Sequence, residues 1–174
     1  MRIILIGYMG SGKSTVGKLL AKLLAKEFKD LDQEIELKEN SNIAEVFSEN
    51  GEIYFRKKEI ETLKIVLEQN TNLVLATGGG TPCYGNTMEF LNSSDNTVTI
   101  YLKTSLQTLT NRLFEERNQR PLISHLINKE ELYDFISKHL FERSFYYNQA
   151  SIKVETDNLS VEDIVESIQQ KLTV

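Results

Sequence analysis

Hydrophobic residues along the chain form two alternating patterns, short continuous runs and longer stretches with helical spacing. The first run, Arg2–Ile6, is unbroken and rich in β-branched residues, which is typical of a strand buried on both faces of a parallel sheet. Over Lys13–Ala25 the apolar positions follow i, i+3, i+4, i+7 and i+8, and this spacing predicts an amphipathic helix.

The same alternation continues to the end of the chain. Further strands are predicted at Glu27–Leu31, Asn72–Ala76, Thr97–Leu102 and Ile152–Glu155. Further helices are predicted over Glu52–Gln69 and Glu130–Tyr147. Three more are indicated by capping residues: Ser41 or Asn42 caps a helix that ends at Gly51, Ser105 caps one that continues through Leu113, and Ser160-x-x-Asp163 caps the last. Because parallel strands need helical crossovers, the pattern predicts a single α/β domain over residues 1–174 with a five-stranded parallel sheet.

Composition narrows the class of protein further. A chain of 174 residues suffices for one domain with a full core, and its net charge of −5 leaves no broad basic face for a nucleic acid. No apolar run reaches the length of a membrane-spanning helix, so no membrane partner is expected. With Cys83 as the one cysteine, no internal disulfide can form, which favours a cytoplasmic location. No heptad seam or surplus apolar stripe is present, which favours a monomer.

The segment Gly7–Ser14 matches G-x-x-x-x-G-K-[ST] and lies between a predicted strand and a predicted helix. Glycines let successive backbone N–H groups point at phosphate oxygens, and the helix N-terminus adds further donors. Lys13 would reach the β- and γ-phosphates, and the Ser14 hydroxyl would bind Mg²⁺. The motif predicts a site for ATP or GTP, with a chance match in a glycine-rich turn as the alternative.

Two carboxylates, Asp30 and Asp32, stand where the second strand is predicted to end. Ligands of open α/β sheets bind beyond the carboxyl ends of strands, so one carboxylate could support Mg²⁺ and the other could accept the proton of an attacking alcohol. The alternative is an acidic turn that caps the next helix.

Three consecutive glycines, Gly78, Gly79 and Gly80, follow the third strand. Without side chains they would let a ligand approach backbone N–H groups, although a flexible connector would also explain them.

Arginines complete the set of candidate functional residues. They are Arg56, Arg143 and Arg120, the last in the polar stretch from Glu115 to Leu126. Two of them could clamp an anionic substrate, and one on a closing loop could stabilise a transferred phosphoryl group. We expect that stretch to be a mobile lid that excludes water during transfer. Each arginine taken alone is also compatible with a solvated surface position.

Together these motifs resemble the shikimate kinases, a group related to the nucleoside-monophosphate kinases. The resemblance rests on GYMGSGKST at 7–15, DLD at 30–32, FRKKE at 55–59, GGG at 78–80, RPL at 120–122 and ER at 142–143. It implies a three-layer α/β/α P-loop kinase with a mobile lid at about 115–126 and a shikimate-binding region at about 32–60. The implied reaction is ATP-dependent phosphorylation of the 3-hydroxyl of shikimate in chorismate and aromatic amino acid biosynthesis, with one Mg²⁺ per ATP.

The resemblance also implies residue roles. Asp32 would bind shikimate hydroxyls and act as base, and Asp30 would support Mg²⁺ beside Ser14. The other implied contacts are ATP with Gly10, Ser11, Gly12, Lys13, Ser14, Thr15, Arg112 and Arg120, and shikimate with Asp32, Arg56, Gly78, Gly79, Gly80 and Arg143. Lys13, Asp32 and Arg120 form the implied catalytic set. The turn at Asp157 and Asn158 occupies the usual adenine-loop position but lacks the arginine or proline often found there, and Cys83, His125 and His139 receive no role.

Three other functions are compatible with a P-loop in a chain of this architecture. A gluconate-type or nucleoside-monophosphate kinase would share the architecture, but the arginines and DLD suit a small polyhydroxylated acid better. A nucleotide-switched regulator would be expected to carry Asn-Lys-x-Asp or an Asp-x-x-Gly after the third strand, and the chain has neither. A catalytically silent homologue would not be expected to retain Lys13, Ser14, Asp32, Arg56 and Arg120 together.

Overall fold

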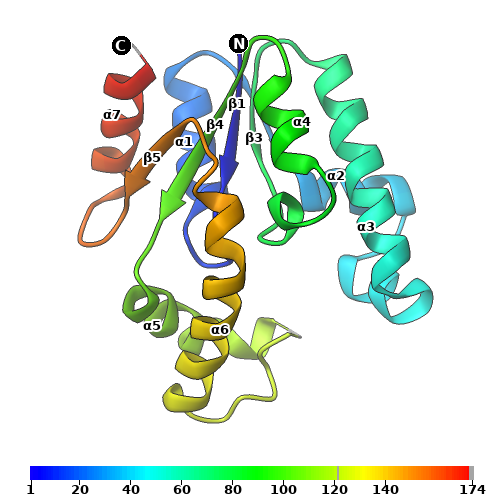
Figure 1. Ribbon diagram of the computed structural model, residues 1–174, viewed down its shortest axis with the longest axis vertical. Helices are drawn as coiled ribbons and strands as arrows, with labels where there is room; N and C mark the ends of the chain where they lie inside the picture. The colour runs from blue at the N-terminus through cyan, green and yellow to red at the C-terminus, as the bar shows by residue number, and fades with distance from the viewer. Residues whose placement is uncertain (121, 173–174) are drawn as a thin grey trace.

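The computed structural model describes residues 1–120 and 122–172. Within them, a parallel sheet of five strands has the order β2-β3-β1-β4-β5. The strands are β1 (Arg2–Ile6), β2 (Glu27–Asp30), β3 (Leu73–Ala76), β4 (Thr97–Lys103) and β5 (Ile152–Glu155). This confirms the predicted sheet, and it places β1 at the centre, so that the loop after β1 lies at the middle of the carboxyl edge (Figure 1).

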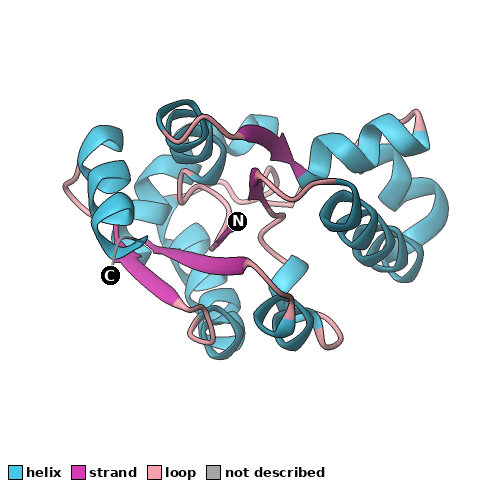
Figure 2. Ribbon diagram, turned by 90° about the horizontal axis from the view of Figure 1, so that it is seen from above, coloured by secondary structure: helices cyan, strands magenta, loops and turns pink. Residues whose placement is uncertain are grey.

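Helices connect the strands and cover both faces of the sheet, as Figure 2 shows from above. They are α1 (Lys13–Leu23), α2 (Leu31–Glu39), α3 (Ile43–Gln69), α4 (Thr87–Ser93), α5 (Leu106–Glu116), α6 (Lys129–Tyr147) and α7 (Val161–Leu172), with the 3₁₀ helices η1 (Thr81–Cys83) and η2 (Arg117–Gln119). The architecture is therefore the expected three-layer α/β/α arrangement.

Alternate residues of β1 enter two separate apolar cores. Ile3 and Leu5 pack with residues of α1 and α7, whereas Ile4 and Ile6 pack with residues of α3, α4 and α6. All four side chains are fully buried, and each contributes about 1.5–3 kcal/mol by leaving water. Burial on both faces explains why the strand is a continuous apolar run without alternation.

Several predicted helix ends are confirmed in detail. Asn42 caps α3 through a capping box with Glu45, and Ser105 caps α5 by accepting a hydrogen bond from the Thr108 N–H. Gly51 has φ 78° and interrupts α3, so that two helical segments meet there as the sequence predicts. The Ser160 hydroxyl accepts from the Asp163 N–H, and Asp163 accepts from the Ser160 N–H in return.

Three features of the fold differ from the sequence-based prediction. The second strand ends at Asp30, and α2, which was not predicted, starts at the next residue. The helices η1 and α4 were likewise not predicted. The expected loop at 115–126 begins with the last turn of α5 and continues as η2, so its first five residues are helical. Pro121, which lies in the middle of that stretch, is outside the described residues.

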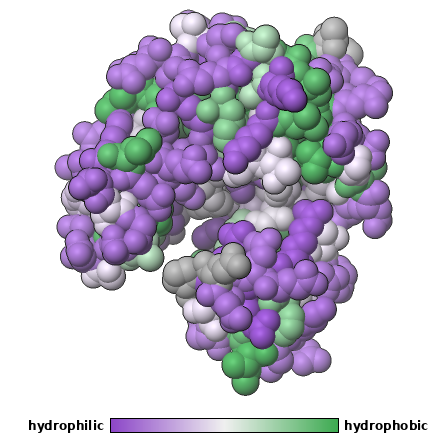
Figure 3. Space-filling model, turned by 180° about the vertical axis from the view of Figure 1, so that it is seen from behind, coloured by the Kyte–Doolittle hydropathy of each residue, from purple (hydrophilic) through white to green (hydrophobic). Residues whose placement is uncertain are grey.

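The carboxyl edge of the sheet opens into a hollow. Figure 3 shows the surface recessed between the part built from α5 and α6 and the part built from α2 and α3. The strands point toward this side, so the residues that follow β1, β2 and β3 gather at it (Figure 1). Among the described helices, none is both long and apolar enough to cross a membrane.

Candidate active site

The loop after β1 has the conformation that phosphate binding requires. Gly7, Gly10 and Gly12 all have positive φ angles, and α1 begins directly after Gly12. The Lys13 ammonium group folds back over the loop and donates hydrogen bonds of 2.9 Å to the carbonyl oxygens of Gly7 and Tyr8. Burial lowers the pKa of Lys13 to about 8, although Asp32 and Asp30 act in the opposite direction.

Ser14 and Asp30 meet at the start of α1. The Ser14 hydroxyl donates a hydrogen bond of 2.6 Å to Asp30 Oδ2, and Asp30 Oδ1 accepts the Asp32 N–H at 3.1 Å as the N-cap of α2. Asp30 is therefore a helix cap and also a partner of the P-loop, so both interpretations of the acidic pair apply to it. Hydroxyl and carboxylate oxygens are the donors that Mg²⁺ prefers, so the pair fits that ion.

Asp32 lies in the first turn of α2 and faces the P-loop lysine. Burial, together with the negative charges of Asp30 and Glu59, raises the pKa of Asp32 to about 6, and Lys13 acts in the opposite direction. A carboxylate with this pKa is ionised at neutral pH and is more basic than an ordinary aspartate. The side chain can therefore accept a proton from an alcohol at this edge.

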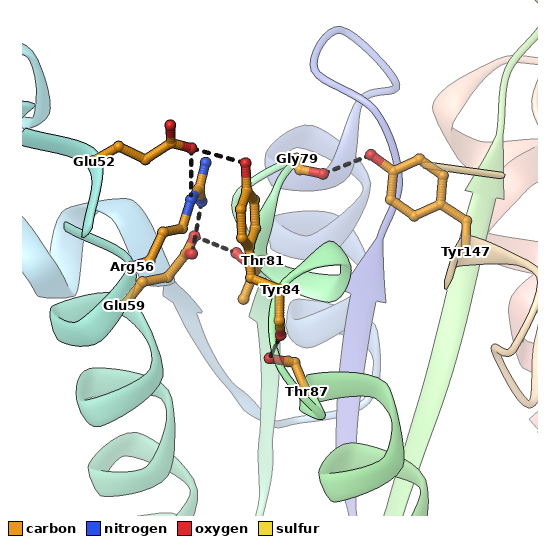
Figure 4. A network of polar contacts seen from close by, with 8 residues as sticks. All are labelled: Glu52, Arg56, Glu59, Gly79, Thr81, Tyr84, Thr87 and Tyr147. Carbon is orange, nitrogen blue, oxygen red and sulfur yellow. Dashed lines mark hydrogen bonds and ion pairs between the residues drawn. The ribbon is translucent and has the colours of Figure 1, made fainter. Parts of the chain in front are cut away.

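Arg56 projects from α3 into a network of polar contacts, drawn in Figure 4. Its Nη1 donates to Glu59 Oε2 at 2.7 Å, and its Nε lies 3.5 Å from Glu52 Oε1. Burial works against the guanidinium charge, but Glu59 and Glu52 outweigh it and raise the pKa of Arg56. Glu59 is 1% exposed and also accepts a hydrogen bond of 2.6 Å from Thr81 Oγ1. Glu59 is not among the predicted site residues, although it follows Arg56 by three residues on the same helix face.

The three glycines after β3 are explained by close packing against three different parts of the site. A Cβ atom on Gly78 would lie 3.0 Å from oxygen atoms of Asp32, Glu59 and Thr81. One on Gly79 would lie 3.1 Å from the backbone nitrogen of Met9 in the P-loop, and one on Gly80 would lie 2.8 Å from Arg56 Nη2. The triplet therefore brings the carboxylates, the P-loop and Arg56 together, a role that differs from that of a flexible connector.

Arg143 approaches the same region from α6. Its Cζ lies 5.6 Å from the centre of the Tyr8 ring in the P-loop. The pKa of Glu52 is lowered mainly by a hydrogen bond from Tyr84 and further by the charges of Arg56 and Arg143, so both arginines act on one carboxylate. Next to Arg143 on α6, the buried Tyr147 donates a hydrogen bond of 2.5 Å to the Gly79 carbonyl oxygen. The structure therefore brings Arg56 and Arg143 close enough to act on the same carboxylate, Glu52.

The two remaining predicted arginines come from α5 and the segment after it. Arg112 of α5 donates a hydrogen bond of 3.1 Å to the Gly10 carbonyl oxygen. Arg120 is paired with Glu116, with its Nε at 2.9 Å and its Nη2 at 2.5 Å from Oε2, and its charge contributes to lowering the pKa of Lys13. Asp157 accepts hydrogen bonds from the backbone N–H and the hydroxyl of Ser105, which fixes its turn to the start of α5.

The parallel sheet with β1 at its centre, the P-loop and the carboxylate beside its lysine define a P-loop kinase. The sequence model of the shikimate kinase family matches residues 9–173. The chain belongs to the shikimate kinase family.

Individual relatives agree over nearly the whole chain. A shikimate kinase from Flavobacterium johnsoniae is 47% identical over 167 residues, which is 96% of each chain, and one from Flavobacterium psychrophilum is 43% identical over 171 residues, 98% of each. The crystal structure of shikimate kinase from Bacteroides thetaiotaomicron superposes with a TM-score of 0.90 at 37% identity and covers 100% of this chain and 99% of its own. Shikimate kinase from Acinetobacter baumannii in complex with shikimate has a TM-score of 0.85 at 35% identity and covers 99% of this chain and 92% of its own.

Proposed function

We propose that the chain transfers the γ-phosphoryl group of ATP to the 3-hydroxyl of shikimate and forms shikimate 3-phosphate and ADP. ATP as co-substrate and shikimate as acceptor follow from membership of the family. The observation that carries the residue assignment is the position of Asp32, an ionised carboxylate with a raised pKa that faces the P-loop lysine.

The nucleotide half of the site is the P-loop and its neighbours. The backbone N–H groups of Gly10, Ser11, Gly12, Ser14 and Thr15 bind phosphate oxygens at the N-terminus of α1. Lys13 leaves the carbonyl oxygens of its own loop and binds the β- and γ-phosphates. Arg112 contacts adenine, and Arg120 exchanges Glu116 for the phosphates when the lid at about 115–126 closes.

The acid half of the site comprises the shikimate-binding region at about 32–60 together with Arg143 and the glycines at 78–80. Arg56 and Arg143 bind the substrate carboxylate, because guanidinium groups match carboxylates in a bidentate way. Gly78, Gly79 and Gly80 line this pocket and keep Asp32, Arg56 and the P-loop close together. Asp32 binds the hydroxyl that is phosphorylated.

Asp32 accepts the proton of that hydroxyl as the oxygen attacks the γ-phosphorus. Because phosphoryl transfer needs positioning and charge stabilisation rather than a protein nucleophile, the remaining residues align the two substrates and stabilise negative charge. Arg120 neutralises charge on the transferred phosphoryl oxygens, and closure of the lid excludes water, which would otherwise hydrolyse ATP.

Ser14 and Asp30 would hold Mg²⁺, because the hydrogen bond between their side chains places two hard oxygen donors side by side. The ion would supply positive charge that neutralises the phosphates. We further propose that the protein acts as a monomer in the cytoplasm.

Release of ADP from Mg·ATP, measured with shikimate, quinate, gluconate or AMP offered separately, tests this function. We expect fast release with shikimate alone. Release stimulated by another acceptor would leave the fold and the P-loop in place but remove the substrate assignment of Asp32, Arg56 and Arg143. A lack of stimulation by any acceptor would favour a catalytically silent homologue.

A further inference from the structure

The structure holds the guanidinium group of Arg56 on several sides. Its centre lies 4.0 Å from the centre of the Tyr84 ring, which is the shortest of its three aromatic contacts, since Phe55 is at 5.1 Å and Phe47 at 6.0 Å. Glu59 binds Nη1, and the Gly80 backbone lies so close that an added Cβ would be 2.8 Å from Nη2. Within the described part of the chain, Nη2 makes no hydrogen bond or ion pair, so this nitrogen is available to a carboxylate.

Tyr84 is itself fixed at both ends. Its hydroxyl donates a hydrogen bond of 2.8 Å to Glu52 Oε1, the oxygen that also lies 3.5 Å from Arg56 Nε. Its carbonyl oxygen accepts a hydrogen bond of 2.7 Å from Thr87 Oγ1 at the start of α4. The tyrosine therefore connects the segment after the glycine triplet to α3, and its ring lies against the guanidinium (Figure 4).

We propose that Tyr84 is a positioning residue for Arg56: its ring, held in place by Glu52, keeps the guanidinium plane in the orientation that receives the carboxylate of the acid substrate. This inference rests on the proposed role of Arg56 in binding that carboxylate. Arginine has many rotamers, and a side chain that is oriented before binding loses less entropy when the substrate arrives. Glu59 and Glu52 hold Nη1 and Nε along one edge, and a ring against the face limits rotation of the guanidinium plane about that edge.

The proposal separates the functions of the ring and of the hydroxyl. Tyr84→Leu removes the ring, and we expect the KM for shikimate to rise about five- to tenfold, with kcat and the KM for ATP within about twofold of the unmodified enzyme. Tyr84→Phe keeps the ring and loses only the tie to Glu52, so the KM for shikimate should rise about twofold. Tyr133→Leu on α6, where the tyrosine is 41% exposed, is the matched control and should leave all three constants unchanged.

A double-mutant cycle with Arg56→Lys distinguishes positioning of Arg56 from a general structural effect. Lysine keeps a positive charge beside Glu59 but has no planar face to align, so Tyr84→Leu should change the KM for shikimate less than twofold in that background. An undiminished effect there, or no effect of Tyr84→Leu in the unmodified enzyme, overturns the proposal for Tyr84. If Tyr84→Leu does not fold, as judged by circular dichroism, Tyr84→Met takes its place in the cycle.

The same measurements separate this proposal from the assignment on which it rests. If Arg56→Lys raises the KM for shikimate while Tyr84→Leu does not, the role of Arg56 stands and that of Tyr84 fails. If Arg56→Lys leaves the KM for shikimate unchanged, bidentate binding of the substrate carboxylate by the Arg56 guanidinium is excluded, and both proposals fail.

Discussion

A methyl group added at Gly80 probes the acid-binding arginine without touching the catalytic carboxylate. Gly80 has φ −88° and ψ −21°, a conformation that alanine adopts without strain, so Gly80→Ala introduces no backbone cost. The new Cβ would lie 2.8 Å from Arg56 Nη2, 2.9 Å from Nη1 and 3.1 Å from Cζ. The variant therefore acts on the guanidinium group.

The structure gives the expected magnitude of that effect. Carbon and nitrogen atoms in contact are normally about 3.5 Å apart or more, so the guanidinium must move by roughly 0.7 Å. A charge-assisted hydrogen bond contributes about 1.5–3 kcal/mol, and a displacement of this size removes a large part of one. The loss of about 1–2 kcal/mol corresponds to a rise of about five- to thirtyfold in the KM for shikimate.

Steady-state ADP release at varied shikimate and varied ATP measures this prediction. Gly79→Ala is the matched comparison, because its Cβ would press on the Met9 backbone nitrogen at 3.1 Å, so this variant should raise the KM for ATP in addition to any effect on the shikimate pocket that Gly79 lines. An unchanged KM for shikimate in Gly80→Ala, or equal changes in both constants in the two variants, would show that Arg56 does not bind the acid from this position. Thermal unfolding of both variants controls for loss of stability.

Further predictions concern the titrating groups and the second arginine. Because Asp32 has a pKa of about 6 and must be ionised to accept a proton, kcat/KM should fall as pH decreases through 6. Because Lys13 has a pKa of about 8 and must be charged, kcat/KM should also fall as pH rises through 8. A pH–rate profile tests both limbs. Asp32→Asn should lower kcat by about 10²–10⁴, and near-normal turnover in this variant would exclude Asp32 as an essential base. Arg143→Ala should mainly raise the KM for shikimate, and unchanged affinity for the acid would remove its proposed carboxylate contact.

The sheet and the P-loop could be predicted because their signals are local. A continuous apolar run such as Arg2–Ile6 encodes burial on both faces, and the motif Gly7–Ser14 encodes its own turn through glycines with positive φ. Caps such as Ser105 and Asn42 likewise act within three residues of themselves. These features need no knowledge of what the rest of the chain does.

The network around Arg56 could not be predicted in the same way, because its contacts join distant parts of the chain. Thr81 bonds Glu59 across 22 residues, and Tyr84 bonds Glu52 across 32. No periodicity marks such pairs. For the same reason the close packing of the glycine triplet against Asp32, Met9 and Arg56 could not be predicted from the sequence.

Asp32 and Lys13 depend on each other at the centre of the site. Burial disfavours the charged form of both groups, so it raises the pKa of the carboxylate and lowers that of the ammonium, and each charge partly offsets the shift of the other. For Asp32, the free energy of unfolding therefore falls as pH rises from 3.8, the ordinary pKa, to about 6, the pKa in the folded protein. For Lys13, it falls as pH decreases from 10.5 to about 8. Between pH 6 and 8 both are charged, and removal of either leaves the other buried with less compensation. The pair is thus retained at a cost in stability, which is consistent with its proposed role in phosphoryl transfer.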